Sequence, residues 1–166
     1  MVDVITYVLD ANVFIEAARR YYAFDLAPAF WRALIEHAIQ GRVLSIDRVS
    51  EELKKGNDDL AKWAKNEFHD WFVSTAEHSV IECYRSIMEW VHSRSQFSDA
   101  AKADFAGGAD GWLVAFARTR GYVVVTHEQF DDKIKRKVPI PNVCRAFDVT
   151  SVDTFAMLRE LGVRLG

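Results

Sequence analysis

Cysteine is scarce in this sequence, and its two copies, Cys83 and Cys144, stand far apart. Two distant cysteines do not form the paired spacing of a zinc module, and they do not make a disulfide framework. The sequence therefore excludes a disulfide-stapled secreted domain and a cysteine-based zinc fold. We interpret both residues as buried free thiols in a reducing compartment.

Long apolar runs are missing as well. No stretch approaches the roughly 20 residues that a membrane-spanning helix needs. The opening residues, MVDVITYVLDAN, lack the basic segment of a signal peptide. These features predict a cytoplasmic protein with no membrane partner, and the length of 166 residues predicts a single domain over residues 1–166.

An excess of positive charge is also lacking, because the formal net charge is −3. This excludes a protein that coats nucleic acid by bulk charge. It does not exclude a nuclease, in which a local basic patch or a metal ion attracts the phosphates. The segment KIKRK is one such patch: Lys133, Lys135, Arg136 and Lys137 could contact RNA as a flexible basic loop, and a solvated charge run explains them equally well.

Short apolar runs alternate with helical patterns along the chain. The runs predict strands at Val4–Leu9, Val43–Ile46, Tyr122–Thr126 and Arg145–Asp148, whereas residues 69–74 fit neither pattern clearly. Helices are predicted between them, the first over Asn12–Tyr22. Strands that alternate with helices form βαβ units. We therefore predict an α/β protein, a three-layer α/β/α sandwich around a central, mostly parallel sheet of four to five strands.

Acidic residues recur where the predicted strands end or a buried helix begins: Asp10, Glu51 and Glu52, Asp110, and Glu128. Open parallel sheets bind ligands at the carboxyl ends of their strands, which is where these residues fall. Taken singly, each has an ordinary structural explanation. Asp10 and Asp110 could cap helices, a glutamate in a first helical turn is favoured by the helix dipole, and Glu128 could be a solvated loop residue.

Taken together, these acids indicate a metal site. Carboxylates gathered at one sheet edge repel one another and raise one another's pKa unless a cation neutralises them. Oxygen ligands without nitrogen or sulfur partners suit Mg²⁺ or Mn²⁺. Such a site can activate water and stabilise charge on a phosphate, which is the chemistry of phosphodiester hydrolysis.

Other motifs give weaker signals. The five histidines show no zinc spacing, and no G-x-x-x-x-G-K-[ST] loop is present. His127 neighbours the acids and could support them or contact substrate, although an ordinary, partly exposed histidine is the more frequent case. Trp112 and Tyr122 could stack on bases, although core packing is the more frequent role of such residues.

Four ordered motifs carry a family resemblance: YVLDANVFIEA, RVSEELKKG, GGADGWLVAFARTRGYVVVTHE and VPIPNVCRAFDV. They resemble the PIN-domain superfamily of metal-dependent ribonucleases, above all the PIN-like family DUF4411, over essentially the whole chain. The resemblance implies a site of Asp10, Glu52 rather than Glu51, Asp110 and Glu128. The last is a glutamate where the family usually has aspartate, so Asp131 or Asp132 is the alternative fourth acid. Asn12 and Thr126 match auxiliary polar positions that orient acids and waters.

The resemblance also implies an activity and partners. It implies a Mg²⁺ or Mn²⁺ cofactor, cleavage of RNA, and a toxin role like that of VapC toxins, with a small antitoxin protein as partner and a homodimer as the common assembly. Two alternatives stay open. One is a non-catalytic PIN-like binding module. The other is a phosphatase with Asp10 as nucleophile, which Asn12 disfavours because the usual second aspartate, the acid/base, is missing there.

Overall fold

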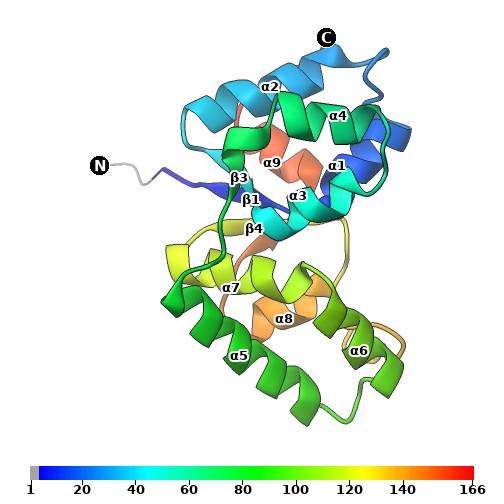
Figure 1. Ribbon diagram of the computed structural model, residues 1–166, viewed down its shortest axis with the longest axis vertical. Coiled ribbons are helices and arrows are strands. Elements are labelled where there is room, and N and C mark those ends of the chain that lie inside the picture. The colour runs from blue at the N-terminus through cyan, green and yellow to red at the C-terminus, as the bar shows by residue number, and fades with distance from the viewer. Residues whose placement is uncertain (1–3) are drawn as a thin grey trace.

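A five-stranded parallel sheet forms the centre of the protein (Figure 1). The structure is a computed structural model that describes residues 4–166. The strands are β1 (Tyr7–Leu9), β2 (Val43–Ile46), β3 (Phe72–Val73), β4 (Val123–Val125) and β5 (Ser151–Val152). Their order is β3-β2-β1-β4-β5, and every neighbouring pair is parallel. The predicted α/β class and its parallel sheet are confirmed.

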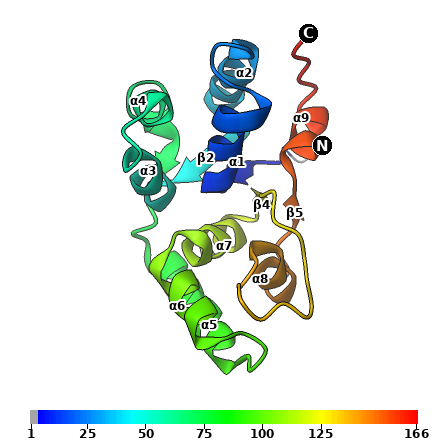
Figure 2. The same cartoon turned by 90° about the vertical axis from the view of Figure 1, so that its right-hand side faces the viewer.

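Helices cover both faces of this sheet (Figures 1 and 2). One layer holds α1 (Ala11–Glu16), α2 (Pro28–Ile39), α3 (Asp47–Lys54), α4 (Asp59–Asn66) and α9 (Thr154–Glu160). The other holds α5 (His78–Ser93), α6 (Asp99–Gly107), α7 (Asp110–Arg120) and α8 (Ile140–Ala146). A π-helical turn η1 (Ala17–Tyr21) extends α1, and a 3-10 turn η2 (His69–Trp71) precedes β3. The three-layer sandwich is thus as predicted.

The chain winds outward from the centre of the sheet in both directions. From β1 it proceeds to β2 and β3 on one side, and β4 then pairs with the other edge of β1 and is followed by β5. The crevice between β1 and β4, at their carboxyl ends, is the topological switch point of such a fold, where α/β proteins bind their ligands. Asp10 follows β1 at this point.

The core explains why the central strands are apolar along their whole length. Tyr7, Val8 and Leu9 are all buried, as expected of a strand covered by helices on both faces. Phe14 of α1 is fully buried and packs its ring against those of Trp63 and Phe68, at centroid distances of 5.9 and 5.8 Å. Burying one such side chain stabilises the fold by roughly 1.5–3 kcal/mol, so this aromatic cluster fixes α1 behind the end of β1.

The predicted strand at Arg145–Asp148 is wrong. Arg145 lies in the last turn of α8, and Asp148 adopts a left-handed conformation with φ 57°. Pro141 stands at the start of α8, where a proline's missing N–H costs no helical hydrogen bond, so this proline-rich segment starts a helix. The last strand is β5, at Ser151–Val152.

The predicted first helix and the predicted state of the cysteines can also be compared with the structure. Asn12–Tyr22 is predicted as one helix, but α1 ends at Glu16 and continues as the π-helical turn. Both cysteines are free thiols, as expected, but only Cys144 is buried, whereas Cys83 is half-buried. Of the helices in residues 4–166, none is long and apolar enough to cross a membrane.

Candidate metal centre

The structure brings the four predicted acids to one edge of the sheet. Asp10 follows β1, Glu128 follows the adjacent β4, Glu52 lies in α3, and Asp110 begins α7. Glu128 and Glu52 both raise the pKa of Asp10, and the other three acids all raise the pKa of Asp110. Repulsion of this kind requires proximity in a poorly solvated place. We call these four residues the acid cluster.

Asp10 is the buried centre of the acid cluster, with 2% of its surface exposed. Its N–H donates to the carbonyl of Val125 at 3.0 Å, and the Thr126 hydroxyl donates to its Oδ2 at 3.0 Å. Asp10 stands at the N-cap of α1, yet its side chain makes no capping hydrogen bond in this part of the described chain. The backbone N–H of Asn12 lowers the pKa of Asp10, but by less than burial and Glu128 raise it. Helix capping alone does not account for this carboxylate.

Burial raises the pKa of Asp10, and repulsion by Glu128 raises it further. The hydrogen bond from Thr126 acts in the opposite direction, and the outcome is a pKa of about 7. A carboxyl group of this kind is only partly ionised near neutral pH when no cation is present. A nearby positive charge would favour its ionised form.

Thr126 connects two members of the acid cluster. It is 2% exposed, its Oγ1 donates to Asp10, and the same oxygen accepts the Glu128 N–H at 3.1 Å. The hydroxyl therefore fixes the carboxylate after β1 relative to the loop after β4. Asn12, the other predicted auxiliary residue, is exposed in the first turn of α1.

Replacing Thr126 by valine should destabilise the protein by about 1–2 kcal/mol, because the side chain keeps its shape but two hydrogen bonds are lost. Urea unfolding in the presence of EDTA measures the change. Thr126→Ser is the matched control, since it keeps the hydroxyl and should be clearly more stable than the valine variant. Equal stability of the two variants would show that the hydroxyl does not connect the acids.

Glu52 and Asp110 meet at the start of α7. The Glu52 Oε1 accepts the N–H of Ala109, the residue before Asp110, at 3.1 Å. Glu51, its neighbour in α3, is exposed. The structure therefore places Glu52, and not Glu51, beside the other acids. Burial is the largest cause of the raised pKa of Asp110, and repulsion by the rest of the acid cluster comes next.

Glu128 faces the acid cluster from the loop after β4. Its Oε1 accepts the Ile140 N–H at 3.0 Å, and its Oε2 lies 3.3 Å from the Lys137 ammonium. The alternative fourth acids are placed differently. Asp131 and Asp132 are exposed, and the Asp131 carboxylate accepts the Lys133 N–H within its own turn. Glu128, rather than Asp131 or Asp132, is therefore the acid beside Asp10.

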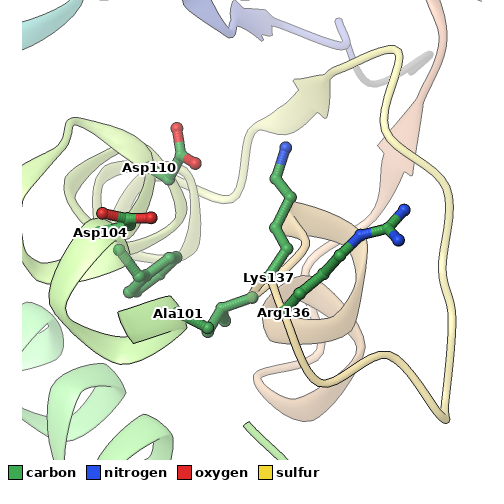
Figure 3. A pocket seen from close by; sticks show the side chains of 7 residues that line it. Ala101, Asp104, Asp110, Arg136 and Lys137 are labelled. Carbon is green, nitrogen blue, oxygen red and sulfur yellow. The ribbon is translucent and has the colours of Figure 1, made fainter. Parts of the chain in front are cut away.

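The basic segment contributes side chains to two pockets. Lys137 and Arg136 line a pocket of about 270 Å³ together with Asp110, and Figure 3 shows Lys137 and Asp110 reaching into the same space while Arg136 is directed away from Asp110. The charge of Lys137 lowers the pKa of Asp110. Lys133 and Lys135, again with Arg136, line a separate concavity of about 370 Å³. Of these four basic side chains, Lys137 is the one that lies beside Glu128 and acts on the pKa of Asp110.

The backbone of this basic segment is attached to the loop before α6. The Ser98 N–H donates to the Lys135 carbonyl at 2.8 Å, and the Gln96 side chain donates to the Ile134 carbonyl at 2.8 Å. These two bonds place the middle of the segment beside the loop before α6.

The residue types of the acid cluster fit a hard divalent cation such as Mg²⁺ or Mn²⁺. All four side chains offer oxygen ligands, and two have raised pKa values that a cation would bring down. Glu52 and Glu128 hold backbone N–H groups in this conformation. Within residues 4–166, no three acidic, histidine or cysteine side chains stand together as a preassembled metal site.

A second pocket adjoins the acid cluster and contains two rings, Tyr21 and Phe155, to which sequence reasoning gave no role. It has a volume of about 520 Å³ and is lined by Thr126 and Glu128 together with Tyr21, His127 and Phe155. Of these three rings, only His127 neighbours an acid in sequence. The signal for Tyr21 is the break in helical periodicity at RRYYAF, whereas Phe155 carries none.

Comparisons with known proteins add a family and a fold. The family described as "Domain of unknown function (DUF4411)" matches residues 7–165, and no curated protein matches the sequence. A chain in the crystal structure of VapBC2 from Rickettsia felis, bound to a DNA fragment from their promoter, has a TM-score of 0.55 and 10% identity, over 90% of this chain and 98% of that one.

Two further structures share the fold. A chain in the structure of FitAB bound to an IR36 DNA fragment has a TM-score of 0.54 and 17% identity, over 89% of this chain and 94% of that one. A chain of FitAcB from Neisseria gonorrhoeae has a TM-score of 0.53 and 18% identity, over 88% and 96%. At these identities the likeness establishes a common PIN-like fold.

Proposed function

This chain belongs to the DUF4411 family, as its motifs predicted, and from that premise we propose that it is a metal-dependent endoribonuclease that hydrolyses RNA phosphodiester bonds. One observation carries the proposal. Asp10 and Asp110 are held at the switch point of the sheet with raised pKa values. Burial is the largest cause for both, Glu128 and Glu52 raise both further, and Asp10 also raises the pKa of Asp110. Clustered carboxylates whose pKa values are strongly raised are typical of functional sites.

The acid cluster would hold Mg²⁺ or Mn²⁺ through Asp10, Glu52, Asp110 and Glu128. When bound, such a cation supplies an activated water and neutralises charge on the phosphate under attack. The chain's own residues prepare this site. Thr126 fixes the orientation of Asp10 by its hydrogen bond, and Lys137 provides a positive charge at the edge of the acid cluster that attracts an RNA phosphate.

We also propose a biological setting for this activity, the toxin of a toxin–antitoxin pair with a small antitoxin protein as partner and a homodimer as assembly. The family resemblance of the sequence motifs supports it. The shared fold with chains of VapBC2 and FitAB, which were solved as assemblies on DNA, is consistent with a chain that acts beside a partner. Co-expression with the neighbouring gene and purification through a tag on this chain would test for a stoichiometric partner.

A second candidate is a non-catalytic binding module that keeps the acids for structural reasons. A specific observation favours it: Glu52 accepts the N–H of Ala109 before α7, and Glu128 accepts the N–H of Ile140 at the start of α8. Both glutamates therefore already satisfy helix ends. Under this alternative the protein would not cleave RNA and would not respond to divalent cations.

RNA cleavage under metal control distinguishes these two candidates. A fluorescently labelled single-stranded RNA should be cleaved in the presence of Mg²⁺ or Mn²⁺, EDTA should stop the reaction, and added metal should restore it. Single-stranded DNA of the same sequence tests the preference for RNA. Intact RNA at every metal concentration would favour the binding module.

Mg²⁺ or Mn²⁺ at millimolar concentration should raise the melting temperature by several degrees, because a ligand that binds only the folded state stabilises it by about 2.7 kcal/mol at 100 times its Kd. Thermal unfolding followed by circular dichroism measures the shift, with EDTA as reference. The Asp110→Asn variant should show a much smaller shift. An equal shift in both proteins would mean that the cation binds elsewhere.

A further inference from the structure

The pocket on the β4 and β5 side of the acid cluster has features that metal binding does not explain. Thr126 and Glu128 line it together with the rings of Tyr21, His127 and Phe155. Its volume of about 520 Å³ lies within the range of small-molecule sites. Because Glu128 belongs to the acid cluster and also lines this pocket, the two sites adjoin.

Three aromatic rings come together here from distant parts of the chain. The Tyr21 ring lies 5.7 Å from that of His127 and 5.6 Å from that of Phe155, measured between centroids. The His127 Nε2 is 3.0 Å from the Thr154 hydroxyl, which fixes the imidazole ring. Even so, Tyr21 remains 49% exposed, so much of its surface is available to a ligand.

The backbone of η1 presents Tyr21 at this position. α1 does not continue as a regular helix past Glu16 but forms a π-helical turn that ends at Tyr21. π-helical turns are rare and are frequently found at functional sites. In this protein the turn brings an exposed tyrosine from the α1 segment to the ends of β4 and β5.

The pocket lining also includes polar residues and a further exposed ring. Phe130 is 44% exposed, and the Arg145 guanidinium lies 4.6 Å from its ring centroid. Gln129, Ser151 and Asp153 also line the pocket and offer hydrogen-bond donors and acceptors. Aromatic faces with polar groups at their edge match the chemistry of a nucleobase, which has two π-faces and a hydrogen-bonding rim.

The two pockets beside the acid cluster differ in a way that fits one nucleotide chain. The pocket next to Asp110 contains Arg136 and Lys137, which suit phosphates, whereas the pocket next to Glu128 contains rings, which suit bases. We propose that the second pocket binds a nucleobase of single-stranded RNA by stacking on Tyr21, next to the phosphate that is hydrolysed at the acid cluster. This inference rests on the proposed function and adds a base-binding subsite to it.

The affinity for short single-stranded RNA tests this subsite. Oligo-adenylate, oligo-uridylate and oligo-cytidylate are titrated in an Asp10→Asn background, which prevents their consumption, and binding is followed by fluorescence anisotropy. Tyr21→Ala should weaken binding of at least one of them by about 5- to 150-fold, the range found when a stacking aromatic is removed. Tyr21→Phe should bind nearly as well as the parent, since it keeps the ring.

A matched control comes from the opposite layer of the protein. Ile81 of α5 is 41% exposed and is not among the residues that line either pocket, so Ile81→Ala removes an exposed apolar side chain and should leave RNA affinity unchanged. Melting temperatures of all variants are compared, because Tyr21 also packs on Phe155. A loss of affinity in Tyr21→Ala with an unchanged melting temperature supports stacking.

Mononucleotides provide a second measurement that does not depend on RNA length. Nucleoside 5′-monophosphates should shift the NMR signals of the Tyr21 and His127 rings, whereas ribose 5-phosphate, which lacks the base, should not. Equal shifts from both ligands, or equal RNA affinity of Tyr21→Ala and its parent, would overturn the subsite. If such results accompany metal-dependent RNA cleavage, only the base pocket fails. If the protein neither binds nor cleaves RNA, the proposed function fails with it.

Discussion

Asp10→Asn is expected to reduce RNA cleavage on the order of 1,000-fold or more while the protein folds normally. Asp10 is buried at the end of β1 and faces the charges of Glu128 and Glu52. Asparagine has the same shape and can still accept the hydrogen bond of Thr126, but it cannot supply the negative charge that holds a divalent cation. The variant therefore separates the charge of residue 10 from its packing.

Initial rates of cleavage of a labelled RNA, measured at several Mg²⁺ and Mn²⁺ concentrations, quantify this loss. Asp110→Asn should lose activity to a similar extent, because its carboxyl group shares the same environment. Glu51→Gln is the matched control, since Glu51 is exposed and adjoins Glu52 in α3. Metal-dependent cleavage that survives in both aspartate variants would refute the proposed nuclease site.

The sequence predicted the parts of the fold that local pattern determines. The runs at β1, β2 and β4 are apolar because each strand is covered by helices on both faces, and such runs can be recognised without tertiary information. By contrast, β3 and β5 contain two residues each. Strands of that length exist through pairing with β2 and β4, and no local pattern distinguishes them from loops.

The acid cluster could be predicted because parallel strands place their carboxyl ends at one edge. Asp10 and Glu128 follow neighbouring strands, so their proximity follows from the order of the sheet. Which basic side chain faces the acids could not be predicted. KIKRK has no periodicity to indicate that Lys137, rather than Lys133, lies beside Glu128. The pocket at Tyr21 could not be predicted either, since a break in helical periodicity does not show where a π-helical turn places the tyrosine.

The same Asp10→Asn change should stabilise the metal-free protein, and the gain should grow with pH. The pKa of Asp10 is about 7 in the folded protein against an ordinary value of 3.8. Between those values the folded state holds a proton that the unfolded state has released, so the stability of the wild type falls as pH rises. Above pH 7 the folded state carries the full cost of a buried charge, about 4 kcal/mol as an upper bound.

Asparagine removes that cost at every pH. The difference in unfolding free energy between the variant and the wild type should therefore be small at pH 4 and should rise to about 1–4 kcal/mol at pH 8. Asp110 contributes in the same direction. Repulsion by Asp10 is the largest cause of its raised pKa after burial, and the variant removes that repulsion. Urea unfolding in EDTA at pH values from 4 to 8 measures the difference.

Added metal should reverse the order of the two proteins. A cation binds and stabilises the ionised acid cluster of the wild type but binds the variant weakly and stabilises it little. At pH 8 the wild type should therefore become the more stable protein in Mg²⁺. If Asp10 has a purely structural role, the variant should be less stable than the wild type in EDTA at pH 8. Added metal should then not change which of the two proteins is more stable. The sign of the difference in unfolding free energy in EDTA, and its reversal by metal, thus test whether Asp10 destabilises the metal-free fold and forms a cation site.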